Sequence, residues 1–131
     1  MIYLLDSDRL IDYLRGRLDA IALVDQLQPD GIALSVVTIA EVMEGIQRDP
    51  ARVAREAAFG QVIRGFTLLA IDEPVARRFA ALRGHLRDVG RTIGDLDTMI
   101  AATALHHDLT LVTRNRRHFE RVPDLKIHRD P

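Results

Sequence analysis

The sequence of 131 residues has no cysteine. Disulfide bridges, thiolate nucleophiles and cysteine-ligated zinc are therefore excluded, and a reducing cytoplasm is the compartment we expect. No apolar stretch approaches the roughly 18 residues that a membrane span requires, so we expect no membrane partner. The N-terminus, MIYLLDSD, has no basic segment ahead of a longer apolar one, which predicts that it is not an export signal.

An excess of charge of one sign is also lacking, because 18 basic side chains nearly balance 19 acidic ones. The net charge of −1 creates no global field that would attract nucleic acid, although a local basic patch is compatible with it. Lysine is almost absent, with Lys126 as the only one, and no glycine-rich phosphate loop is present. The length fits one domain, which we expect to span residues 1–131.

Short apolar runs alternate with amphipathic segments along the chain. Strands are predicted at residues 2–5, 32–37, 66–71 and 109–113. Helices are predicted at residues 8–16, 18–31, 38–46, 49 to about 64 and 72–90, and within the alanine-rich segment 91–108, followed by a loop over 114–131. This alternation predicts a three-layer α/β/α sandwich around a mostly parallel central sheet.

Acidic or amide side chains follow the predicted strands. Asp6 comes directly after the first strand, Glu41 lies one helical turn after the second, Asp95 and Asp97 open the alanine-rich helix, and Asn115 follows the last strand. In parallel sheets, functional groups gather beyond the carboxyl ends of the strands. Converging carboxylates repel one another unless a cation neutralises them, and oxygen ligands suit Mg²⁺ or Mn²⁺ better than zinc. The pattern predicts a metal site.

Helix capping is the alternative interpretation for three of these acids. Thr38 and Glu41 have the spacing of a capping box, in which Glu41 would satisfy only the first backbone amides of a helix. Asp95 would serve equally well as an N-cap, and Asp97 would lie in the first turn, where the helix dipole favours an acid. Spacing alone leaves both interpretations open.

Asp6 has the weakest structural explanation of these acids, because Ser7 or Asp8 beside it would make a better N-cap. We therefore expect Asp6 to be a metal ligand. Three roles stay open for Asp8: a second ligand, a contact that orients Asp6, or a cap, which ranks first. Arg114 and Arg116 belong to a short basic run, which is usually a solvated surface but would also suit a phosphate backbone.

Four stretches of the sequence, YLLDSDRLIDYL, LSVVTIAEVMEGI, IDEPVARRFAALR and IGDLDTMIAATALHHDLTLVTRNRRHFERVPDL, together cover nearly the whole chain. They resemble the PIN-domain nucleases, and more closely the VapC-like toxins of bacterial toxin–antitoxin pairs. The last stretch is the most specific, because an acid followed by IAATAL and then by TLVTRN is a long ordered match.

The resemblance implies an endoribonuclease that uses Mg²⁺ or Mn²⁺ to hydrolyse RNA phosphodiester bonds. It further implies a homodimer and a cognate antitoxin that blocks the cleft. Asp6, Glu41 and Asp97 would be the core metal-binding acids, and Asp95 would be an additional acid nearby. Asn115 falls where many members have a fourth acid, and here it offers only a neutral oxygen to the catalytic set.

The same resemblance gives roles to polar residues around these acids. Ser7 and Thr113 would orient ligands or contact phosphate, and Arg114 and Arg116 would hold the RNA strand. Asp8 stands where the family commonly has asparagine, a departure that leaves its role open.

Two rival functions differ from a nuclease in what they require. In a haloacid-dehalogenase-type phosphatase, Asp6 would be the nucleophile and Asp8 the acid/base. That chemistry needs a lysine between its acidic motifs, whereas Lys126 follows both. A non-catalytic PIN-like interaction protein would use its acids only as caps and its cleft only to bind a partner.

Overall fold

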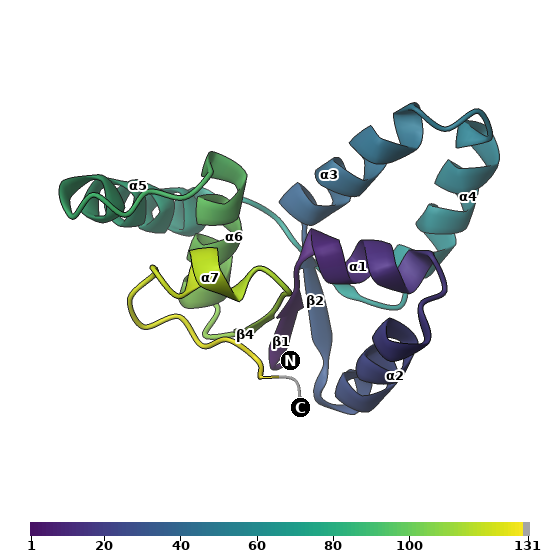
Figure 1. Cartoon of the computed structure of the whole chain (residues 1–131), viewed down its shortest axis with the longest axis horizontal. Helices are drawn as coiled ribbons and strands as arrows, with labels where there is room; N and C mark the ends of the chain where they lie inside the picture. Colours follow the sequence, from purple (N-terminus) through teal and green to yellow (C-terminus); the bar gives the residue numbers. More distant parts are fainter. Residues whose placement is uncertain (130–131) are drawn as a thin grey trace.

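The computed structural model describes residues 1–129, in which a four-stranded parallel sheet lies between two layers of helices (Figure 1). The predicted three-layer sandwich is confirmed. The elements are β1 (Tyr3–Leu5), α1 (Ser7–Leu14), α2 (Leu18–Leu27), the 3₁₀ helix η1 (Gln28–Asp30), β2 (Ile32–Ser35), α3 (Val36–Gln47), α4 (Arg52–Ile63), β3 (Thr67–Leu69), α5 (Glu73–Asp88), α6 (Asp95–His106), β4 (Thr110–Val112) and α7 (Arg116–Phe119).

The strand order is β3-β2-β1-β4, and every pair of neighbours is parallel. The central strands are continuous apolar runs because helices cover both faces of the sheet. Leu4 packs with the side chains of α5 and α6, whereas the next residue, Leu5, packs with those of α1 to α4. Figure 1 shows these two groups of helices on opposite sides of the sheet.

The parallel arrangement brings the carboxyl ends of the strands to one edge of the sheet. One residue separates α1 from β1, α3 follows β2 directly, and three residues separate α7 from β4. The first turn of α6 lies at the same edge, because α6 runs back across the sheet before β4 begins (Figure 1). The residues that open these four helices are therefore neighbours in space.

The start of α3 differs from the prediction. Ser35 is its N-cap, and the Ser35 hydroxyl accepts a hydrogen bond of 3.0 Å from the backbone N–H of Val37. Thr38 is therefore the third residue of the helix and is buried. The interpretation of Thr38 and Glu41 as a capping box is therefore wrong, because Glu41 lies too far into the helix to satisfy its first backbone amides.

Up to residue 129, the segment after β4 is more ordered than the loop predicted over 114–131, whose last two residues lie outside the described part of the chain. It forms the short helix α7, places Phe119 in the core with none of its surface exposed, and returns as a bridge between Ile127 and Leu111. A four-residue helix is too short to show a helical period in the sequence. Within residues 1–129, no helix combines the length and the apolar character needed to cross a membrane.

Candidate metal centre

Asp6 lies at the end of β1 and only 4% of its surface is exposed. It is itself the N-cap of α1, so the prediction that Ser7 or Asp8 caps this helix is wrong. Asp6 Oδ1 accepts a hydrogen bond of 2.8 Å from the Ser7 N–H, and Oδ2 accepts one of 2.7 Å from the Thr113 hydroxyl. Burial, followed by the charge of Asp8, raises the pKa of Asp6 to about 7.

Glu41 lies in the second turn of α3 and is half-buried. Its Oε1 atom is buried and has no hydrogen-bond partner among the described residues. Burial raises the pKa of Glu41 most, and the charges of Asp97 and Asp8 raise it further, whereas a hydrogen bond from the Ser7 hydroxyl lowers it. Glu41 therefore lies within electrostatic reach of the acids that open α1 and α6.

Asp97 occupies the first turn of α6, where it is half-buried. Burial raises its pKa, the charge of His118 lowers it, and the charge of Asp8 raises it. His118 Nδ1 lies 4.0 Å from Asp97 Oδ2 and 3.0 Å from the side-chain nitrogen of Asn115. His118 therefore links Asn115 to Asp97. The sequence did not identify His118 as part of this site.

Asp8 does not cap α1, which corrects the role ranked first for it. Its Oδ2 atom accepts a hydrogen bond of 3.0 Å from the Arg114 N–H and lies 3.4 Å from the Thr113 hydroxyl. Its Oδ1 atom is buried without a hydrogen-bond partner among residues 1–129. Asp8 therefore connects α1 to the loop after β4.

Two predicted site residues, Asp95 and Arg114, form ion pairs outside the set of acids. Asp95 opens α6 but does not cap it, since the N-cap is Gly94, and Asp95 instead pairs with Arg83 Nε at 2.9 Å. Arg114 Nε lies 3.2 Å from Asp12 Oδ2, a buried carboxylate that the sequence analysis missed. The spacing of Asp12, four residues after Asp8 on one helix face, was the signal that could have revealed it.

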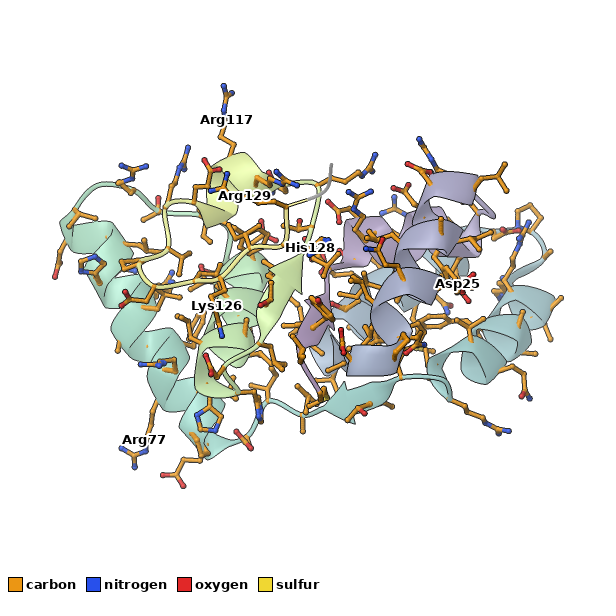
Figure 2. The ribbon with its side chains drawn as sticks, turned by 90° about the horizontal axis from the view of Figure 1, so that it is seen from below. Asp25, Arg77, Arg117, Lys126, His128 and Arg129 are labelled. Atoms are coloured by element: carbon orange, nitrogen blue, oxygen red, sulfur yellow. The ribbon has the colours of Figure 1, made fainter. Side chains whose placement is uncertain are left out.

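Arg116 is the first residue of α7 and lies near His128, in the segment that returns to β4. Burial lowers the pKa of His128 most, and the positive charge of Arg116 lowers it further. The neighbouring Arg117 projects away from the molecule, as Figure 2 shows. Of the basic run, Arg117 points into solvent, while Arg116 faces the segment that returns to β4.

The donor set fits a hard dication, because it consists of carboxylate oxygens and includes the unpartnered Asp8 Oδ1 and Glu41 Oε1. Within residues 1–129, however, no three His, Asp or Glu side chains form a ready-made metal-binding group. Mg²⁺ usually keeps several waters and binds proteins through one or two carboxylates. The arrangement therefore suits a partly hydrated ion better than a closed protein cage.

Lys126 does not belong to this centre. Its Nζ atom pairs at 2.8 Å with Oδ1 of Asp108, in the loop that enters β4 at the opposite edge of the sheet. The phosphoryl-neutralising lysine of a haloacid-dehalogenase-type phosphatase thus has no counterpart beside Asp6.

Known proteins are similar to this chain over nearly its whole length. Residues 3–125 match the family model described as PIN domain. The chain is 38% identical over 125 residues to Ribonuclease VapC19 of Mycobacterium tuberculosis, covering 94% of this chain and 96% of that protein.

Solved structures are similar over the same length. VapBC-1 from nontypeable Haemophilus influenzae has a TM-score of 0.87 and 29% identity, with 98% of this chain and 97% of that chain covered. VapBC-5 from Mycobacterium tuberculosis, described as a member of the VapBC family of toxin-antitoxin systems, has a TM-score of 0.71 and 26% identity, with coverages of 97% and 95%. The chain belongs to the PIN domain family.

Proposed function

We propose that the protein is a metal-dependent endoribonuclease and the toxin of a toxin–antitoxin pair. The observation that carries this proposal is the convergence of Asp6, Glu41 and Asp97, three acids with raised pKa values, at the carboxyl edge of a PIN-domain sheet. The family relationship to VapC ribonucleases supports RNA as the substrate.

Asp6, Glu41 and Asp97 would hold Mg²⁺ or Mn²⁺, with Asp8 and Asn115 beside them. Such an ion supplies an activated water and offsets charge on the phosphate. The Thr113 hydroxyl fixes one oxygen of Asp6, and the Ser7 N–H fixes the other, so this carboxylate is oriented before any ligand arrives. We assign Asp95 to its ion pair with Arg83 and leave it outside the ligand set.

The chain also provides groups that would contact RNA. Arg116 directly follows Asn115 at the start of α7, and a phosphate contact there would position the strand without reading its sequence. The side chains of the centre include no cysteine, and catalysis through bound water requires no nucleophile from the protein. We expect the enzyme to work in the cytoplasm, where its RNA substrate is found.

A cognate antitoxin is the partner we propose for the clefts beside Glu41. One cleft of about 290 Å³ is lined by Glu41, Leu14 and Ile46, among others. It adjoins a more apolar cleft of about 400 Å³, which shares Leu14 and Ile46 and extends to Phe59. A segment bound along both would cover the approach to Glu41.

We also propose a homodimer, which the resemblance to VapC-like toxins implies. Val36 and Met43 of α3 and Leu68 of the edge strand β3 are exposed apolar side chains that a second copy would cover. Light scattering on the purified chain measures its mass directly, and a monomer across the micromolar range would contradict this part of the proposal.

The nuclease is tested by substituting Asp6 with asparagine, which keeps the N-cap but removes the charge. We expect cleavage of a structured RNA in Mg²⁺ to fall at least about 100-fold, more than the loss typical of residues that only support a ligand. Asp25→Asn, the same change on the exposed surface of α2 (Figure 2), is the matched control and should cleave like the wild type.

The second arm of this experiment removes the metal. We expect the wild type to lose cleavage in EDTA and to regain it when Mg²⁺ is added. Contaminating ribonuclease is excluded first with a mock purification from cells that lack the protein. Undiminished cleavage by Asp6→Asn, or by the wild type in EDTA, would then contradict the proposal. A folded wild type that never cleaves RNA but still binds its antitoxin would favour the non-catalytic interaction protein.

A further inference from the structure

Arg114 is held at two points by α1. Its backbone N–H donates a hydrogen bond of 3.0 Å to Asp8 Oδ2, and its side-chain Nε lies 3.2 Å from Asp12 Oδ2. Asp8 and Asp12 are one helical turn apart, so they present both carboxylates on the same face of the helix. Two acids of α1 thus fasten one residue of the loop after β4.

Asp12 differs from the acids of ordinary surface ion pairs because it is buried. Its side chain is 4% exposed, whereas that of Arg114 is 50% exposed. No donor among residues 1–129 makes a well-aligned hydrogen bond to Asp12 Oδ2, so the guanidinium provides the charge that compensates it. Removing one partner of a buried pair is costly, since the other charge stays desolvated.

The position of Arg114 in the chain gives this pair a consequence for the metal centre. The preceding residue, Thr113, donates its hydroxyl proton to Asp6 Oδ2 at 2.7 Å. The same hydroxyl accepts a hydrogen bond of 3.0 Å from the N–H of the following residue, Asn115. Arg114 lies between Thr113 and Asn115, so a fixed Arg114 restrains both the hydroxyl that orients Asp6 and the N–H that bonds to this hydroxyl.

We propose that Asp8, Asp12 and Arg114 form a clamp that holds the Thr113 hydroxyl on Asp6. The three are positioning residues, and Arg114 serves this clamp in preference to the RNA phosphate contact predicted from the sequence. The effect of the clamp on catalysis rests on the proposed nuclease function, whereas its effect on the loop does not.

Asp12→Ala opens the clamp and leaves only the half-exposed Arg114 to be rehydrated. We expect the Asn115 amide, which reports the position of the Thr113 hydroxyl, to exchange its hydrogen about tenfold faster in metal-free protein. The Leu111 amide, which bonds to the Lys126 carbonyl, is the internal reference for global opening and should be unchanged.

The same variant is then titrated with Mn²⁺ in a calorimeter and assayed for RNA cleavage. Both the Mn²⁺ affinity and the cleavage rate should fall about tenfold, within the range known for groups that orient a metal ligand. Asp12→Ala combined with Arg114→Ala should be no worse than Asp12→Ala alone, because both changes break one unit.

Glu73→Ala is the matched control, because it removes the acid of the exposed pair with Arg77 on α5. Figure 2 shows Arg77 pointing outward from the periphery of the molecule. This control should leave the Asn115 exchange rate, the Mn²⁺ affinity and the cleavage rate as in the wild type. Asp12→Asn, which keeps the side-chain volume, replaces Asp12→Ala if the latter does not fold and should change all three in the same direction.

Asp8 is tested by comparing two substitutions. Asp8→Ala removes the acceptor of the Arg114 N–H, and Asp8→Asn keeps an acceptor oxygen, so the Arg114 amide should exchange faster in the first than in the second. Equal Asn115 exchange in the Asp12 variants and in Glu73→Ala would overturn the clamp, whether or not metal binds. A wild type that neither binds Mn²⁺ nor cleaves RNA would instead count against the proposed function.

Discussion

Asp6 combines two tasks that the sequence analysis treated as alternatives. It caps α1 through Oδ1, and its Oδ2 receives the Thr113 hydroxyl at the edge of the sheet. An N-cap needs only one carboxylate oxygen, so capping does not exclude a role as a ligand. A residue at the junction of a strand and a helix can therefore be an N-cap and a metal ligand at once.

The pKa of Asp6 makes the stability of the metal-free protein depend on pH. The pKa of Asp6 is about 7 in the folded protein and 3.8, its ordinary value, in an unfolded chain, so between these pH values the folded state binds a proton that the unfolded state does not. This contribution is full below the unfolded pKa and is lost as the pH rises through the folded one. Stability from Asp6 therefore falls between about pH 4 and pH 7.

Asp6→Asn removes this titration and leaves the other groups in place. From pH 8 to pH 5, the free energy of unfolding of the wild type should rise relative to that of the variant by about 2–3 kcal/mol. Urea unfolding in EDTA at the two pH values measures the difference. An identical gap between the two proteins at both pH values would show that Asp6 titrates normally.

The elements with strong periodic patterns were predictable, and the junctions between them were less so. The continuous apolar runs around Leu4, Leu34 and Leu111 predicted buried strands because both faces of the sheet are covered. The start of α3 was misplaced because Thr38 looks like a cap, yet it is buried in the helix that Ser35 caps. Local cap chemistry cannot reveal which of two hydroxyls the tertiary fold will bury.

The turn before β2 depends on a glycine. Gly31 has a φ of +85°, its carbonyl accepts hydrogen bonds from Ile2 and Tyr3, and an added Cβ would lie 2.9 Å from Met1 Cα. Gly16 has a similar φ of +75° but nothing within 4 Å of such a Cβ. A side chain at Gly16 would meet only backbone strain, whereas a side chain at Gly31 would meet backbone strain and a steric overlap with Met1.

Gly16→Ala should therefore cost about 1–2 kcal/mol of unfolding free energy from the left-handed conformation alone. Gly31→Ala should cost at least about 1 kcal/mol more, because the N-terminal strand must also shift. Denaturant unfolding of both variants against the wild type gives the comparison. Equal losses would mean that the start of β1 moves freely away from Gly31.

The parallel sheet as a whole explains why acids distant in the sequence meet. Asp6 precedes α1, Glu41 lies in α3 and Asp97 lies in α6, and each comes to the same edge because the strands all run in one direction. The sequence predicted this convergence from the strand-end rule. The sequence did not predict the roles of Asp12 and His118. These roles depend on contacts of the segment after β4 with α1, through Asp12, and with α6, through His118.

Binding of a dication by these acids has a direct measurement: anomalous diffraction from crystals of the protein soaked in Mn²⁺, recorded at the manganese absorption edge. We expect one strong peak or a close pair of peaks bounded by the carboxylates of Asp6, Glu41 and Asp97. A peak beside Asp95 and Arg83, or no peak at this edge of the sheet in crystals that took up Mn²⁺ elsewhere, would contradict the metal centre.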